Sequence, residues 1–591
     1  MQSQTTPDSL DYTEYLKLAA FALLCFFAFA YNLGEVPPYH SDENFYVTST
    51  RNMINSGDYL TPVYHDKKRF AKPILFYWLV VTSYKAFGVS LFSARLVSAF
   101  FGALCIPLVY IIARRLFDKK TAMLSAFLLP GCYLHYQIAR WAITDMALNF
   151  FILLAIYFFI RGLRDDPDRG TLIYLAYASM GIGFMIKGPP AVLIPALTVG
   201  IFTMALFDRG IFSRLRLVSG AVILTALIAP WFTTMLLLHG DEFKNHILGA
   251  EFRDRIIHDT PFSLYYMGVT LRYYLPWSLF FVTALVVRFI TNPGTAAIVS
   301  DKNRYLTSLF EIIKIRFTEL REKDHQPLLF CLAWILGPLL LFTLFRIEHS
   351  RYMLPISPAI VMITAHYLAR TADSPTSYQK KSFKIPFYLT LIIYFLLAIL
   401  SGIAMSLIQP VFPPPLPLLF LPGILFLGVG CLLLCYRYRK VTALVITISL
   451  LQLATLTSFS GDALPFFNRY PMKAFAEEIL ADPHPEKQIG LYRLGNHRAR
   501  IGVLTGLPSL YLNNAEELKQ FIQSGKKVFV VMRESDWKEE FSDLPLALQA
   551  IDTGWRKVRL DWDRLRQIRK DGLKPHLPEY TETYVLLAVV K

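Results

Sequence analysis

The chain has 591 residues, of which 54% are hydrophobic and 18% charged, and its mean hydropathy is +0.40. Apolar runs recur from residue 15 to about residue 460, which is more than a soluble core needs and predicts a polytopic membrane protein. The formal charge of +16 lies in short basic clusters between these runs, a pattern that sets membrane orientation and argues against nucleic-acid binding.

The first apolar segment, roughly Tyr15 to Leu33, is long enough to cross a bilayer core of about 30 Å at about 1.5 Å per residue. We read it as a retained anchor, since no small-residue cleavage site follows it. Asp42 and Glu43 come directly after this segment. Carboxylates beside an apolar boundary cost free energy unless they face water, a cation or a substrate, so this pair is the first candidate for chemistry.

The next apolar segment, Pro73–Gly88, is short and contains Lys85. If this segment crossed the membrane, the basic residues Arg114 and Arg115 would lie outside, against the preference of basic loops for the inner side. We therefore expect an interfacial or re-entrant helix on the outer side. The first segment that returns to the inner side is then Leu91–Ala113. If every basic cluster lies inside, an even number of spans separates neighbouring clusters, and the total is about thirteen spans. The last span, Val441–Ser458, is a weak candidate. The N-terminus is expected inside, and the C-terminal region outside.

From residue 461 onward the composition changes, because charged residues become frequent and apolar runs become short. The segments Gln488–Arg493, Lys527–Met532 and Tyr584–Val590 predict strands, and Asn514 is placed to cap a helix over Ala515–Gln523. Residues 1–460 are therefore expected to form the membrane domain and residues 461–591 a small periplasmic α/β domain, which either caps the protein or contacts substrate.

This topology brings the unusual polar side chains to one membrane face. The set comprises Asp42, Glu43, Lys72, Arg140, Asp145, Lys187, Glu251, Arg255, His258, Asp259, Arg346, Glu348, His349, Arg351 and Tyr352. Carboxylates can act as general bases or stabilise an oxocarbenium-like sugar, while Lys and Arg can hold a phosphate leaving group. Together these features predict sugar transfer from a polyprenyl phosphate carrier.

The ordered motifs resemble the multi-spanning GT-C glycosyltransferases of the protein O-mannosyltransferase superfamily, over residues 10 to 370. The first matches are Asp42-Glu43, Lys72-Pro73 and the stretch from Arg140 to Asp145. Further matches are similar to the bacterial branch that includes the lipid A aminoarabinose transferase, and they are Lys187-Gly188-Pro189, Pro230-Trp231, Asp241-Glu242-Phe243, Glu251 with Arg255 and His258, Pro276-Trp277, and Tyr352-Met353-Leu354-Pro355.

The resemblance implies a role for each site residue. Asp42 would be the main catalytic carboxylate, Asp145 the second, and Glu43 a supporting one. Lys72 would bind the carrier phosphate. The remaining substrate-binding side chains would be Arg140, Tyr46, Lys187, Arg255, His258 and Tyr352.

Structural alternatives stay open for several of these residues. Asp42, Glu43 and Asp145 are also ordinary helix starts, and Lys72 can snorkel to the interface. Lys187 can simply end a span, and Arg255 is spaced to form a helical pair with Glu251.

The chain departs from the aminoarabinose transferase pattern at Ala71, where that pattern has an acidic residue that can hold zinc together with a histidine. His258 occupies the likely histidine position, but one histidine is a poor metal anchor. All six cysteines lie in or beside apolar runs, so neither a disulfide framework nor a cysteine metal site is predicted. We therefore assign no metal ligand and no cofactor, with a divalent metal as the alternative.

The expected partners are a polyprenyl-phosphate sugar donor, membrane lipids, and lipid A or another envelope acceptor, with no nucleic acid. The expected location is the bacterial inner membrane. A protein or a wall polymer is the alternative acceptor. A lipid-linked sugar transporter and a non-catalytic scaffold are the other function classes, although charges at one interface and the absence of a clear repeat disfavour a transporter.

Overall fold

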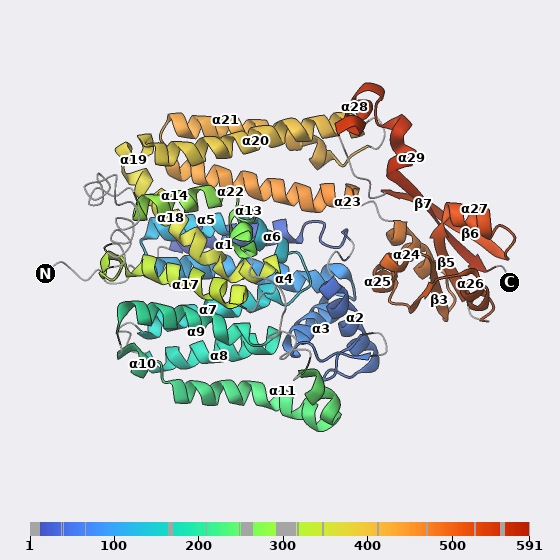
Figure 1. Ribbon diagram of the computed structural model, residues 1–591, viewed down its shortest axis with the longest axis horizontal. Coiled ribbons are helices and arrows are strands. Elements are labelled where there is room, and N and C mark those ends of the chain that lie inside the picture. Colours follow the sequence, from blue (N-terminus) through green and yellow to red (C-terminus); the bar gives the residue numbers. More distant parts are fainter. Residues whose placement is uncertain are drawn as a thin grey trace, which may run out of the picture.

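The computed structural model describes residues 12–36, 38, 41–64, 67–163, 169–208, 210–247, 249, 264–290, 315, 318–344, 348–409, 413–467, 471–524, 527–555 and 562–589. A bundle of long helices occupies one part of the molecule, and a small sheet domain extends from one end of it (Figure 1).

Ten helical segments in the described part of the chain are long and apolar enough to cross a membrane. They are α1 (Tyr12–Ala30), α4 (Leu91–Leu116), α7 (Asp145–Leu163), α8 (Arg169–Lys187), α11 (Leu217–His246), α17 (Gln326–Leu344), η3 with α18 (Ser350–Ile356 and Ser357–Asp373), α20 (Lys381–Ile408), α21 (Leu416–Arg437), and α22 (Val441–Ser458) continued by η4 (Phe459–Ala463) and α23 (Leu464–Phe467).

Three further segments are shorter or broken. The helices α13 (Tyr265–Arg272) and α14 (Trp277–Phe289) meet at 111° and add an eleventh crossing if they count as one span. The other two are α9 (Pro190–Leu206), and α5 (Lys119–Leu128) followed by η1 (Leu129–Gly131) and α6 (Tyr133–Ile138). The expected total of thirteen stays a prediction, because it also requires these two to cross.

The helix α3 (Leu75–Phe87) has 13 residues, so at about 1.5 Å per residue it is too short to cross a bilayer core of about 30 Å. It packs on α4 and on α2 (Ser41–Ser56), and both short helices lie at the end of the bundle that faces the sheet domain (Figure 1). A short two-stranded ribbon, β1 (Val63–Tyr64) and β2 (Lys67–Lys68), connects them.

The basic clusters gather at the opposite end of the bundle. Lys120 Nζ lies 2.6 Å from Asp373 Oδ1, and Arg321 Nε donates to the carbonyl of Ala205. The short helices α10 (Gly210–Arg214) and α19 (Pro375–Gln379) lie at this end (Figure 1). The bundle therefore has one end with basic loops and an opposite end that carries α2, α3 and the sheet domain, as the predicted alternation of inner and outer loops requires.

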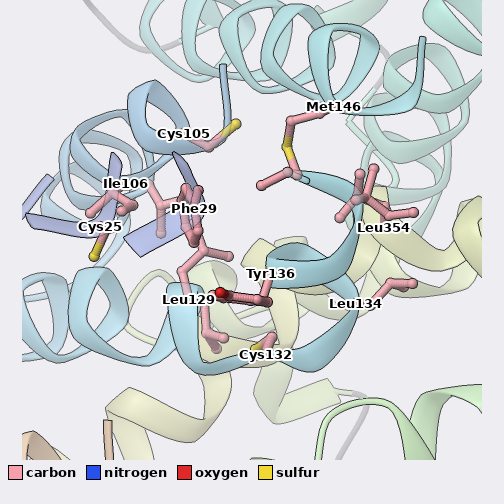
Figure 2. Close-up of a cluster of buried hydrophobic side chains, with 14 of the residues drawn as sticks. Cys25, Phe29, Cys105, Ile106, Leu129, Cys132, Leu134, Tyr136, Met146 and Leu354 are labelled. Atoms are coloured by element: carbon pink, nitrogen blue, oxygen red, sulfur yellow. The ribbon is translucent and has the colours of Figure 1, made fainter. Parts of the chain in front are cut away.

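The core of the bundle is a continuous apolar cluster. Figure 2 shows Phe29 of α1 beside Cys105 and Ile106 of α4, with Tyr136 of α6 and Met146 of α7 around them. All six cysteines are free thiols, and four of them are buried. They act here as small apolar packing residues.

The C-terminal part forms a five-stranded mixed sheet of order β4-β3-β5-β7-β6. The strands are β3 (Lys487–Tyr492), β4 (Ser509–Leu512), β5 (Lys527–Arg533), β6 (Leu546–Trp555) and β7 (Thr581–Val589). Its helices are α24 (Pro471–Ala481), α25 (Gly495–Thr505), α26 (Ala515–Ile522), α27 (Glu534–Glu540), α28 (Trp562–Asp571) and α29 (Leu577–Tyr580), with η5 (Lys574–His576) before the last.

Alternate residues of β5 bury into two apolar clusters, one on each face of the sheet. Phe529 and Val531 pack on one side, and Val528, Val530 and Met532 on the other. The three strands predicted from the sequence are present as β3, β5 and β7, and a small α/β domain is confirmed. Asn514 caps α26 as expected, since its Oδ1 accepts from the Glu517 amide at 2.9 Å.

The sheet domain contacts the bundle through α2 and the turn after α1. Arg51 donates to the carbonyls of Gly502 and Val503, and Lys473 Nζ lies 2.5 Å from Glu35 Oε2. The domain therefore packs on the short helix that carries the Asp42-Glu43 pair.

Candidate functional site

Asp42 lies in the first turn of α2, where the helix dipole favours a carboxylate. Its Oδ2 is 2.7 Å from Nη2 of Arg351, at the start of η3. The Asp42 side chain is 31% exposed, whereas Arg351 is 10% exposed. Asp42 is therefore held by a mostly buried cation while its carboxylate stays accessible.

Asp145 begins α7, and Lys187 ends α8, which packs against α7. Gly188 takes the left-handed conformation directly after α8, with φ 102°, a common way to end a helix. This turn leaves Lys187 Nζ 2.5 Å from Asp145 Oδ1, with both side chains less than 10% exposed. The pair joins the start of one helix to the end of the next.

Arg351 connects the two carboxylates, because its Nε lies 3.9 Å from Asp145 Oδ1. The Lys187 ammonium lies 4.8 Å from the centroid of the Tyr352 ring, which also packs against Phe342. We call Asp42, Asp145, Lys187 and Arg351 the charge network. Two acidic and two basic side chains thus lie together beside the ring of Tyr352, although up to about 300 residues of sequence separate them.

Four residues predicted from the sequence, Asp42, Asp145, Lys187 and Tyr352, are brought together in this way. Arg351 was not among the assigned site residues, although it stood in the polar set on the same face. The available signal was its position directly before Tyr352 in the matched motif.

Glu43 points away from this network. Its carboxylate accepts from Arg95 Nε at 2.6 Å and Nη2 at 2.8 Å, and also from the amide of Ala142. Glu43 is 0% exposed and Arg95 is 2% exposed. The contact with the Ala142 amide joins the start of α2, which carries Asp42, to the turn before α7, which begins at Asp145.

The side chain of Arg140 binds backbone carbonyls at the end of α1. Its Nη1 donates to the carbonyl oxygens of Phe29 at 2.8 Å and Tyr31 at 2.7 Å. Together with Arg95 it lines a cavity of about 240 Å³ between α6 and η4, whose described lining includes no member of the charge network. These contacts do not join Arg140 to Asp42.

Tyr46 is buried one turn after Asp42, and its ring lies 5.0 Å from Phe76 and 5.2 Å from Tyr77. Burial, then the nearby Tyr77 and Asp42, raises the pKa of the Tyr46 phenol well above its usual value. The phenol is therefore a neutral hydrogen-bonding group beneath Asp42.

Lys72 is half-buried just before α3, and its Nζ donates to the carbonyl of Ala71 at 2.6 Å. Arg255 and His258 lie outside the described residues. Within the described part of the chain, no group of three or more His, Cys, Asp or Glu side chains is arranged to hold a metal ion.

A family model described as dolichyl-phosphate-mannose-protein mannosyltransferase matches residues 71–233. An uncharacterized protein of Aquifex aeolicus is 27% identical over 471 residues, which cover 79% of this chain and 82% of that protein. The undecaprenyl phosphate-alpha-4-amino-4-deoxy-L-arabinose arabinosyl transferase of Aeromonas hydrophila is 26% identical over 382 residues. That alignment covers 63% of each chain, slightly less than two thirds of the relative.

The crystal structure of ArnT from Cupriavidus metallidurans bound to undecaprenyl phosphate matches with a TM-score of 0.68 and 20% identity. The match covers 98% of this chain and 99% of that one, so it includes both the helix bundle and the C-terminal domain. The chain thus shares the fold of ArnT, and its sequence relatives include GT-C glycosyltransferases of the aminoarabinose transferase branch.

Proposed function

We propose that this protein transfers a sugar from an undecaprenyl phosphate carrier to lipid A, with 4-amino-4-deoxy-L-arabinose as the first candidate sugar. The sequence relatives named for this reaction and the fold of ArnT support the proposal. The observation that carries it is the charge network, because Arg351 is shared by two carboxylates and Lys187 lies next to it.

In this reaction the bond from the sugar anomeric carbon to the carrier phosphate oxygen breaks, and a bond to an acceptor oxygen forms. The carrier phosphate leaves with the electron pair. Lys187 and Arg351 are placed to stabilise that phosphate, and Asp42 and Asp145 to stabilise the positive charge that develops on the sugar.

An arriving phosphate competes with the carboxylates for Arg351 and Lys187. Binding of the donor would then weaken the contact between Arg351 and Asp42, which leaves the more accessible carboxylate available to the acceptor. The resting ion pairs thus hold both charged partners in position before the substrate arrives.

The identity of the acceptor decides what Asp42 must do. An acceptor hydroxyl has to lose its proton, and Asp42 is placed to take it. An acceptor phosphate of lipid A is already ionised and needs no base, so Asp42 would then act only by orienting the groups around the sugar.

The proposal is tested by transfer of a radiolabelled sugar from undecaprenyl phosphate to lipid A in membranes carrying Asp42→Asn. We expect transfer to fall by about 10²-fold or more, the size typical of losing a general base or a preorganised charge. Asp241→Asn is the matched control, because it removes one exposed carboxylate near the end of α11. Full activity in Asp42→Asn would remove Asp42 from its assigned role.

A second candidate is transfer of mannose to a protein, which the description of the matching family model favours. Mass spectrometry of a deletion strain separates the two candidates. Loss of an aminosugar from lipid A supports the first, and loss of hexose from envelope proteins with lipid A unchanged supports the second.

We also propose that the protein lies in the bacterial inner membrane with the charge network on the periplasmic side, and that residues 461–591 form a periplasmic domain. The clustering of basic loops at the opposite end of the bundle supports this orientation. Arg51 of α2 donates to the carbonyls of Gly502 and Val503, and this contact supports a role for the domain in entry of the acceptor.

A further inference from the structure

A cavity of about 270 Å³ lies at the basic end of the bundle. It is enclosed by α14, α18, the turn before α17 and the connection from α19 to α20, which lie close together in Figure 1. The helix α18 separates it from the charge network. This helix follows η3, and Arg370 in its last turn lies about 20 Å from its first residue, Ser357, at about 1.5 Å per residue. The sugar and the phosphate of a donor bound at the charge network therefore lie outside this cavity, whose described lining includes no member of the network.

The polar wall of the cavity is strongly basic. It contains Arg288, His325, His366, Arg370 and Lys380, with Asp324 as the one carboxylate in the described lining. Burial, and then the charge of Arg288, lowers the pKa of His325, so His325 is neutral at pH 7. Three permanent positive charges and one carboxylate therefore line the cavity, and Glu319, outside the lining, lies 3.5 Å from Nη1 of Arg288.

Hydrogen-bond donors accompany these charges. Ser377 and Ser382 bring hydroxyl groups to the lining, and Nδ1 of His366 is buried without a hydrogen-bond partner among the described residues. Guanidinium and ammonium groups with hydroxyl donors are the groups that bind phosphate oxygens in proteins. The polar wall is thus suited to a phosphate group.

The opposite wall is apolar. Phe117, Leu285 and Ile363 line it, and Val286 on α14 and Ile385 on α20 are exposed beside it, by 39% and 57%. A free anion gains nothing from apolar surface, whereas a lipid can place its headgroup on the basic wall and an acyl chain along these side chains.

We infer that this cavity, here called the basic pocket, binds the phosphate headgroup of an anionic phospholipid in the leaflet opposite the charge network. Arg370 and Lys380 contact the phosphate from its exposed side, and Arg288 contacts it from within the bundle. The bound lipid links α14, α18 and α20, and so stabilises the helices that continue from the Arg351 segment.

The test measures phosphatidylglycerol binding to the purified full-length protein by native mass spectrometry. The variant is Arg370→Gln with Lys380→Gln, and both side chains are exposed, so the fold should persist. The control is Arg437→Gln with Lys381→Gln, two exposed basic residues at the same end that do not line the pocket. We expect affinity to weaken about fivefold for each pocket charge removed, roughly 25-fold in the pair, and to stay unchanged in the control.

Thermal unfolding in detergent gives a second measurement. Phosphatidylglycerol should raise the unfolding temperature of the wild type and the control but not of the pocket variant, and phosphatidylcholine should raise none of them. Equal phosphatidylglycerol binding by the pocket variant and the control would overturn the inference. Displacement of the lipid by millimolar inorganic phosphate would also overturn it, since the pocket would then select a free anion.

Discussion

At the scale of single residues, two neighbouring acids have different environments. Asp42 is 31% exposed and paired with Arg351, whereas Glu43 is fully buried and paired with Arg95. Successive residues of a helix point about 100° apart, so one faces the site and the other faces the core. The side chains across from each acid, which come from distant parts of the chain, set its role.

The buried pair should matter for stability. Glu43→Gln leaves the Arg95 charge buried without its full partner, so we expect a loss of about 3–5 kcal/mol in the free energy of unfolding. Glu242→Gln is the matched control, because its pair with Lys68 is exposed and should be worth about 0–1 kcal/mol. Denaturant unfolding of the purified protein in detergent measures both, and equal effects would contradict this account.

At the scale of helices, small residues set how closely neighbours pack. Gly220 of α11 faces Tyr177 of α8, and a Cβ atom added there would lie 2.3 Å from a carbon of the ring. Gly200 of α9 has nothing within 4 Å of the same position. Close helix contacts in membranes depend on small residues in this way.

The two glycines should respond with opposite signs. Gly220→Ala should destabilise the protein by about 1–3 kcal/mol, because the rigid Tyr177 ring must move. Gly200→Ala should be neutral or stabilising by about 0.5–1 kcal/mol, since alanine is the better helix former. Thermal unfolding of both full-length variants is the measurement. A lower unfolding temperature for Gly200→Ala would show that helix propensity does not determine the stability effect at position 200.

At the scale of the whole molecule, the two ends of the bundle differ in chemistry. The charge network, α2 and the sheet domain share one end, and the basic clusters and the basic pocket share the other. A polarity of this kind is what orients a chain in a membrane.

Cysteine labelling tests the orientation. In intact spheroplasts, an impermeant maleimide should label Asp241→Cys, near the end of α11, but label Arg437→Cys only after permeabilisation. The unsubstituted protein is the control, because four of its six cysteines are buried and the other two are partly so. The reverse pattern of labelling would invert the orientation.

The long spans could be predicted because lipid demands continuous apolar segments and internally satisfied backbone. The break between α5 and α6 and the bend between α13 and α14 could not be predicted in this way, since packing against neighbouring helices compensates for each break. The strands β4 and β6 were also missed. The first has four residues, and much of the second is exposed at the sheet edge, so neither shows a full apolar alternation.

The sequence by itself determined the membrane class, the α/β domain and the acids that begin α2 and α7, because hydropathy and helix-start chemistry are local. Only the tertiary structure decided that Arg351 joins Asp42 to Asp145. It also decided that Glu43 pairs with Arg95 and that Arg140 binds a carbonyl of α1. The physical reason is that the cost of burying a charge depends on its partners, and these partners lie from 52 to more than 300 residues away along the chain.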